Sequence, residues 1–152
     1  MATREYPDGL DCIWLAVDGN GHLGAFVTGG AGPIPTSALS ESSFPIEDVE
    51  AEVCGLPNIS EARLLVPMKR PDDFIEMAQR GFFVYDWRDV HRTLHESKHA
   101  YELIAVPLTP LRVNELPDHI WKLATTATLP GLAFVEELAL DVEAVLQCRR
   151  AS

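Results

Sequence analysis

Three histidines with regular spacing are the strongest candidates for chemistry in this chain. His91, His95 and His99 recur every four residues in a polar stretch that also holds Asp86 and Asp89. Two histidines four residues apart on a helix can bind one metal ion. The stretch lacks the glutamate of the HExxH pattern, and the strand-like segments beside it favour a loop or a ragged turn. We therefore expect solvated or hydrogen-bonded histidines and no cofactor. A metal-binding protein or metal-dependent enzyme is the alternative.

A glycine-rich stretch at Gly29, Gly30 and Gly32 resembles a phosphate-cradling loop in composition. A phosphate-binding P-loop ends in Lys-Ser or Lys-Thr and leads directly into a helix. Here Pro33 and Pro35 follow, and they exclude a helix at that point. The sequence therefore predicts a glycine turn.

Three carboxylates lie close together at Asp72, Asp73 and Glu76, as a general acid and base would require. Catalysis would also need burial or a charged neighbour to shift the pKa of one of them. At the exposed start of a helix, acidic residues are better explained by the helix dipole and by solubility. No serine or cysteine lies in a recognisable nucleophile motif. We therefore expect no catalytic residues and no enzymatic activity.

Apolar runs bounded by turn residues predict the strands. Residues 12–17 and 23–28 flank the sequence Asp-Gly-Asn-Gly, and both Asp-Gly and Asn-Gly are strong hairpin signals. The Ser-rich residues 36–44 are expected to form an irregular connection. Further strands are predicted at 62–66, 82–86, 100–106 and 132–135.

Helical spacing of apolar residues predicts three helices. The first is expected to begin near Pro45 and to end before Gly55, with Ile46, Val49 and Val53 facing inward. The other two are expected from Pro71 to Gly81, and from a cap at Asn114 along the apolar stripe 116–127.

The C-terminal tail fits two kinds of secondary structure, and the chain as a whole fits one domain. Residues 136–150 fit a helix, because they are acidic at the start and basic at the end, but 138–142 also fit a strand. We expect one α+β domain over residues 1–152. Its mainly antiparallel sheet would have about five to six strands packed with about three helices.

Charge and composition narrow the classes of partner. Twenty-three acidic residues face twelve basic ones, which gives a formal net charge of -11, while hydrophobic residues make up an ordinary 47%. Acidity argues against nucleic acid and anionic membranes as partners. No apolar run reaches the ~20 residues that span a bilayer. The first residues lack a secretory pattern, and the three cysteines form no CxxC pair, so we expect a cytoplasmic protein.

Several segments between Asp11 and Val113 carry a family resemblance. The segments are residues 14–22 (WLAVDGNGH), 26–35 (FVTGGAGPIP), 70–74 (RPDDF), 83–91 (FVYDWRDVH) and 101–107 (YELIAVP). Together they resemble a family of small bacterial proteins of unassigned activity, some of which look like immunity proteins of polymorphic toxin systems. The resemblance implies binding to a toxin and supplies no catalytic residues.

The sequence therefore predicts a non-enzymatic cytoplasmic binding protein. Its partner would be a cognate toxin, and a basic toxin would suit the acidity because opposite charge accelerates association. The acidic residues expected to bind it are Glu47, Asp48, Glu50, Glu52, Asp72, Asp73 and Glu76. Trp87, Arg88 and Asp89 are expected to anchor the partner from a loop after the aromatic strand. A small-molecule sensor or structural adaptor is a further alternative, which an enclosed apolar pocket would indicate.

Overall fold

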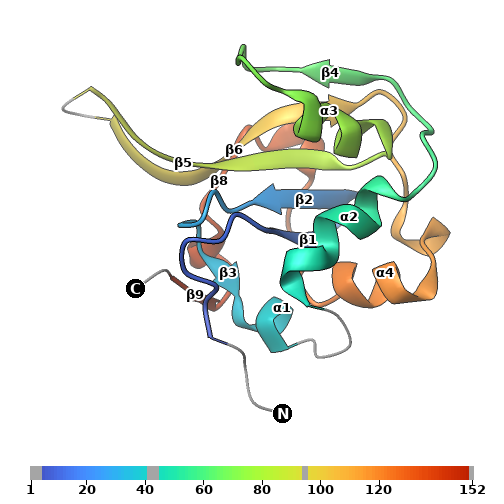
Figure 1. Cartoon of the computed structure of the whole chain (residues 1–152), viewed down its shortest axis with the longest axis horizontal. Helices are drawn as coiled ribbons and strands as arrows, with labels where there is room; N and C mark the ends of the chain where they lie inside the picture. Colours follow the sequence, from blue (N-terminus) through green and yellow to red (C-terminus); the bar gives the residue numbers. More distant parts are fainter. Residues whose placement is uncertain (1–4, 41–44, 94–95, 151–152) are drawn as a thin grey trace.

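A mixed sheet runs through the middle of the molecule (Figure 1). The computed structural model describes residues 5–40, 45–93 and 96–150, with the backbone path alone between 88 and 99. Within them, the sheet consists of β1 (Ile13–Asp18), β2 (Leu23–Val27), β4 (Ala62–Leu64), β5 (Phe83–Thr93), β6 (Glu96–Pro107), β7 (Thr128–Leu129) and β8 (Ala139–Leu140).

The order of the strands is β4-β6-β5-β2-β1-β7, and β8 also pairs with β6. The β2–β5 and β1–β7 pairs are parallel and the others antiparallel. A separate two-stranded sheet joins β3 (Ile34–Pro35) to β9 (Cys148–Arg149). The predicted α+β class with a mainly antiparallel sheet is therefore confirmed.

The turn between β1 and β2 has the expected hairpin chemistry. Asp18 Oδ1 accepts hydrogen bonds from the backbone nitrogens of Asn20 and His22, both at 2.9 Å. Gly21 has a φ of 77°, a conformation that glycine adopts without steric cost. The Asp-Gly-Asn-Gly sequence thus fixes the register in which β1 and β2 pair.

Short helices cover one face of this sheet (Figure 1). They are α1 (Thr36–Ser40), the 3₁₀ helix η1 (Ile46–Asp48), α2 (Val49–Cys54), α3 (Asp72–Gln79) and α4 (Asp118–Ala124). Ile46, Val49 and Val53 are buried, as their spacing predicts. The third predicted helix begins later than Asn114, after the 3₁₀ helix η2 (Val113–Glu115). Leu116 is extended, since the residue before a proline avoids the helical region.

Aromatic rings form the core on the other face. Trp14, Phe26 and Tyr85 occupy paired positions on β1, β2 and β5, and their rings stack at centroid distances of 4.1 and 4.8 Å. Tyr101 of β6 meets Phe26 edge-on at 5.2 Å, and Phe134 closes the cluster at 5.9 Å from Phe26. Such pairs contribute about 0.5–1.5 kcal/mol each beyond the area they bury.

The C-terminal segment covers that aromatic face and differs from the prediction. Residues 132–135 form no strand: Phe134 begins the 3₁₀ helix η3 (Phe134–Glu136). The tail forms no long helix within the described residues. The alternative strand at 138–142 is confirmed in part by β8, and the 3₁₀ helix η4 (Val142–Ala144) and β9 follow it. Phe134, Leu140 and Val142 are its buried residues, and this irregular spacing suits a segment that winds across a sheet.

Two other connections were predicted wrongly. Residues 36–40 form helix α1, whose Leu39 is buried, where an irregular connection was expected. The polar stretch after Trp87 is not a loop, because β5 and β6 continue as a hairpin with pairs from Trp87↔Tyr101 to Thr93↔Glu96. This hairpin extends beyond the rest of the molecule (Figure 1). Cross-strand pairing overrides the loop-like composition.

Candidate functional site

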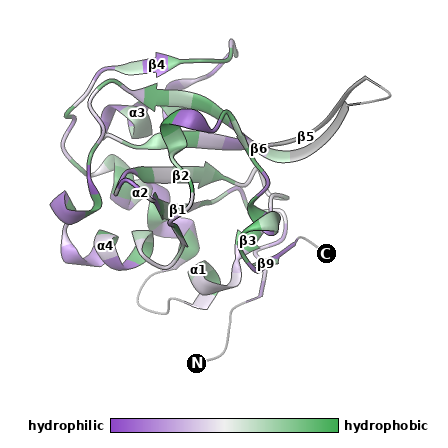
Figure 2. Ribbon diagram, turned by 180° about the vertical axis from the view of Figure 1, so that it is seen from behind, coloured by the Kyte–Doolittle hydropathy of each residue, from purple (hydrophilic) through white to green (hydrophobic). Residues whose placement is uncertain are grey.

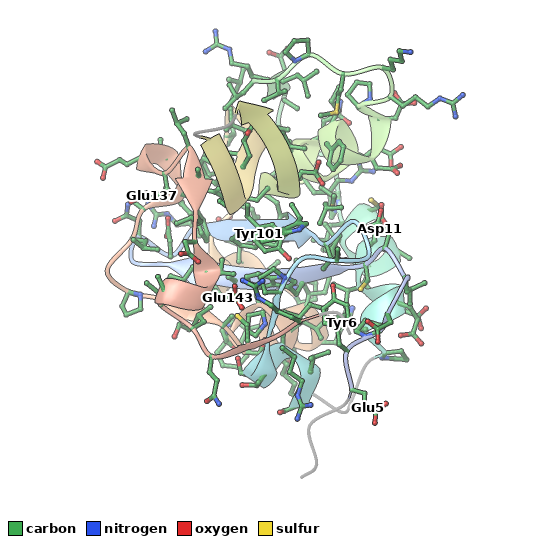
Figure 3. The ribbon with its side chains drawn as sticks, turned by 90° about the vertical axis from the view of Figure 1, so that its left-hand side faces the viewer. Glu5, Tyr6, Asp11, Tyr101, Glu137 and Glu143 are labelled. Carbon is green, nitrogen blue, oxygen red and sulfur yellow. The ribbon has the colours of Figure 1, made fainter. Side chains whose placement is uncertain are left out.

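Acidic residues of α2 and α3 lie close to one another. Burial raises the pKa of Glu50 on α2, and the carboxylates of Asp73, Asp11 and Glu76 raise it further. Asp73 and Glu76 belong to α3, so carboxylates from two helices act on the same side chain. Asp11 lies beside α2 in Figure 3. The sequence placed these residues on separate helices, and the structure brings the helices together.

We call this surface the acidic helix face. Its members are Asp11, Glu47, Glu50, Asp73 and Glu76. Asp48 and Asp72 are exposed next to Glu47 and Asp73 in the sequence. Glu47 joins it because its carboxylate and that of Asp11 both act on Cys12, whose pKa is raised first by burial. Asp11 was not predicted, since it precedes the first strand and no local pattern links it to a helix.

No carboxylate of the acidic helix face forms an ion pair within the described residues. None of Glu47, Asp48, Glu50, Asp72, Asp73 and Glu76 forms an ion pair there. Arg80 lies close by, but its guanidinium donates to two backbone carbonyls, those of Leu56 at 3.2 Å and Glu76 at 3.1 Å. The carboxylates therefore repel one another and keep their negative potential available to a partner.

Glu52 points elsewhere. Its carboxylate lies 3.2 Å from Nε2 of His119, on α4. Of the seven acidic residues predicted to bind a partner, Glu47, Glu50, Asp73 and Glu76 thus belong to the acidic helix face, and Glu52 contacts the neighbouring helix instead. For Asp48 and Asp72, the place on this face stays a prediction.

The predicted anchor residues lie apart from the acidic helix face. Trp87 is half-buried on β5 and packs edge-on against Tyr101, with ring centroids 5.2 Å apart. Tyr101 belongs to the aromatic face, which the C-terminal segment covers. Trp87 is therefore on the opposite side of the sheet from α2 and α3. Arg88 and Asp89 follow in the projecting hairpin, paired with Ala100 and His99.

The histidines do not form a helical cluster. His91 and His99 lie on the two strands of the hairpin, paired with Ser97 and Asp89, and His95 lies outside the described residues. The backbone is therefore not the helix that would align the three imidazoles along one face. Among the residues whose side chains are described, no group of three or more His, Cys, Asp or Glu is arranged to hold a metal ion. A metal site on the hairpin stays a prediction.

The cysteines have the properties of buried structural thiols. Burial, together with nearby carboxylates, raises the pKa of Cys54 to about 11 and that of Cys148 to about 12. The thiolate is the reactive form of cysteine, so both groups are poor nucleophiles at neutral pH.

A small cavity between the sheet and the helices offers little room. It is lined by residues that include Ile13, Leu15, Val49 and Leu123, and has a volume of about 10 Å³. That space suits one water molecule at most. An organic ligand of a small-molecule sensor does not fit there.

Comparison with known proteins gives no relative from which to transfer a function. No family model, curated protein or solved structure matches this chain. Within the described residues, no helix has the length and apolar character needed to cross a membrane.

Proposed function

We propose that this chain is a non-enzymatic binding protein that uses its acidic helix face to bind a basic surface of a partner protein. The observation that supports the proposal is that the contacting helices α2 and α3 bring Asp73 and Glu76 near Glu50, with no ion pair at these carboxylates within the described residues.

The acidic helix face lowers the stability of the free protein, and a basic partner would offset this loss. Repulsion among Glu50, Asp73 and Glu76 opposes folding, and burial of Glu50 adds to that cost. A complementary cluster of Lys or Arg would offset both effects and would accelerate association by electrostatic steering. This surface is therefore better suited to a charged protein partner than to a small ligand.

We propose further that the partner is a toxin and that the chain acts as its immunity protein. The support is the resemblance of residues 11–113 to small bacterial proteins of unassigned activity, some of which look like immunity proteins, together with the acidity. Toxins that cleave nucleic acid need basic surfaces to approach phosphates. An acidic protein that covers such a surface would block access of the substrate.

A growth assay tests this function. Each gene next to the one encoding this chain is expressed singly in a bacterial host, and those that arrest growth are co-expressed with this chain. We expect one neighbouring product to be toxic and the chain to restore growth. If no neighbouring product is toxic, or if the chain restores growth against none, the immunity function is wrong.

Matched variants connect the rescue to the acidic helix face. The triple variant Glu50→Gln/Asp73→Asn/Glu76→Gln removes three charges from it. The control variant Glu5→Gln/Glu61→Gln/Asp141→Asn removes three charges from exposed positions elsewhere. We expect the first variant to lose rescue and the control to keep it. Equal rescue by both would show that the acidic helix face is not the binding surface.

A further inference from the structure

An open groove lies on the face of the sheet away from the helices. Phe83, Leu103 and Val106 are among the residues that line it, and its volume is about 370 Å³. Arg63 of β4 and Leu65, which follows β4, line one side, and Val135 and Leu138 of the C-terminal segment line the other. Figure 2 views the molecule from this side, with β4 along one edge.

The rim of the groove exposes apolar side chains that a monomer leaves in water. Leu138, Val135 and Leu108 are 68%, 61% and 58% exposed, the highest values among the large hydrophobic residues described. Leu65 is exposed beside them. Scattered apolar residues are normal on a protein surface, but a rimmed apolar patch is typical of a contact with another protein.

Charges of both signs accompany this apolar patch. Arg63, on the β4 side, is exposed and forms no ion pair within the described residues. Glu136 and Glu137 stand between Val135 and Leu138 on the other side, and they too are unpaired among the described residues. The chain has a net charge of -11, so an unpaired positive charge beside an apolar groove stands out from the rest of its surface.

The patch is therefore complementary to itself. Val135 and Leu138 are projecting apolar side chains, the groove is an apolar hollow, and Arg63 and the two glutamates have opposite charges. A two-fold interface places the same patch on both subunits and therefore requires such self-complementarity.

We propose that the occupant of the groove is a second copy of this chain. Val135 and Leu138 of each copy enter the groove of the other, and Arg63 of each copy pairs with Glu136 or Glu137 of the other. The proposal is independent of the proposed function, because the acidic helix face lies on the opposite side of the sheet. Figure 3 shows Glu137 and Asp11 on opposite sides of the molecule.

This arrangement also limits the repulsion between two acidic copies. A contact through the groove directs both acidic helix faces away from the interface. Exposed charges farther apart than about 8 Å are largely screened at physiological ionic strength. Both acidic helix faces stay accessible to other partners in the dimer.

Sedimentation velocity of the full chain across a micromolar concentration series tests the proposal. We expect dimers that dissociate on dilution, and Leu138→Asp should weaken dimerisation by at least about tenfold. The control is Val145→Asp, since Val145 is 51% exposed and lies outside the groove. Unchanged thermal unfolding of Leu138→Asp would exclude a folding defect. A chain that stays monomeric at all concentrations, or dimers that Leu138→Asp leaves intact, would overturn the proposal.

A charge-reversal experiment tests the reciprocal pairing. Arg63→Glu and the double variant Glu136→Lys/Glu137→Lys each create like-charge contacts in their own homodimers, and each should dimerise roughly tenfold more weakly. In a mixed dimer of the two variants, the new glutamate at position 63 of one subunit faces the new lysines at positions 136 and 137 of the other. The second contact joins the unchanged Arg63 to the unchanged Glu136 and Glu137. We expect the mixture to recover dimers. Failure to recover them would contradict the two-fold contact.

Discussion

The carboxylate of Asp18 accepts a hydrogen bond from the backbone nitrogen of Phe134, at 2.9 Å, across 116 positions of the chain. Its other oxygen accepts from the backbone of Asn20 and His22 in the β1–β2 turn. One buried side chain therefore holds the hairpin turn and the C-terminal segment together. This bond places the Phe134 ring against the aromatic stack.

Replacing Asp18 by asparagine tests this link. The amide keeps the shape of the side chain but puts an NH₂ group where an acceptor is needed, so at least one backbone N–H loses its partner. We expect a loss of about 2–3 kcal/mol in the free energy of unfolding, measured by chemical denaturation. The control Asp141→Asn, at an exposed position, should change it by less than about 0.5 kcal/mol. Equal effects would contradict the role given to Asp18.

Much of the first half of the fold could be predicted from local sequence patterns. The hydrogen bond between Asp18 and Phe134 could not. The β1–β2 turn and the buried residues Ile46, Val49 and Val53 follow from turn chemistry and from helical spacing. The C-terminal segment has neither signal, because its conformation depends on a sheet formed by distant residues. Local patterns specify elements, and here the packing of the sheet specifies the tail.

The candidate site was predictable in its residues but not in its arrangement. The acidic residues of α2 and α3 are visible in the sequence, whereas the proximity of Glu50 to Asp73 and Asp11 depends on how the elements pack. Trp87 was expected on a loop after the aromatic strand. Its partner Tyr101 lies 14 positions away on the next strand, and that pairing places Trp87 on the other face of the sheet.

Tyr101 is expected to contribute more to stability than Tyr6. The Tyr101 hydroxyl accepts from Trp14 Nε1 at 3.2 Å and donates to the carbonyl of Pro33 at 2.9 Å. The Tyr6 hydroxyl donates to the carbonyl of Gly32 at 2.6 Å and also contacts the Thr28 hydroxyl, which keeps the backbone nitrogens of Cys12 and Gly30 as other partners. Tyr101→Phe leaves two buried groups unsatisfied and should cost about 2–4 kcal/mol, against about 1–2 kcal/mol for Tyr6→Phe. Denaturation curves of both variants measure the difference. A larger loss for Tyr6→Phe would contradict this assignment.

Glu50 should make stability depend on pH. Its pKa is raised in the folded protein, so the folded state binds the proton more tightly than the unfolded chain does. The resulting stability is complete below the unfolded pKa and is lost as the pH rises through the folded pKa. At neutral pH the ionised Glu50 therefore opposes folding. Glu50→Gln should be more stable there by roughly 0.5 kcal/mol, since solvent screens this partly exposed group.

The measurement is thermal unfolding of Glu50→Gln and of the wild-type chain between neutral and mildly acidic pH. The difference should shrink as the pH falls and Glu50 becomes protonated. Glu61→Gln is the control, because Glu61 is exposed and outside the acidic helix face. A Glu50→Gln variant less stable than the wild type at neutral pH would show that Glu50 makes a favourable contact instead.

Elemental analysis of the untagged protein decides the metal alternative. We expect less than one equivalent of any transition metal, and the same content in the variant His95→Ala. Stoichiometric metal that is lost in His91→Ala or His99→Ala would show that the hairpin is a metal site. Val145→Asp serves as a control for nonspecific effects of mutation.

The affinity of the purified chain for the toxin identified by growth rescue tests the proposed function most directly. The dissociation constant and both rate constants are measured over a range of salt concentrations. For Glu50→Gln/Asp73→Asn/Glu76→Gln we expect affinity at least about tenfold lower at low salt, mainly through slower association, and a weaker salt dependence. The control triple variant should match the wild type. Wild-type affinity and salt dependence in Glu50→Gln/Asp73→Asn/Glu76→Gln would contradict binding through the acidic helix face.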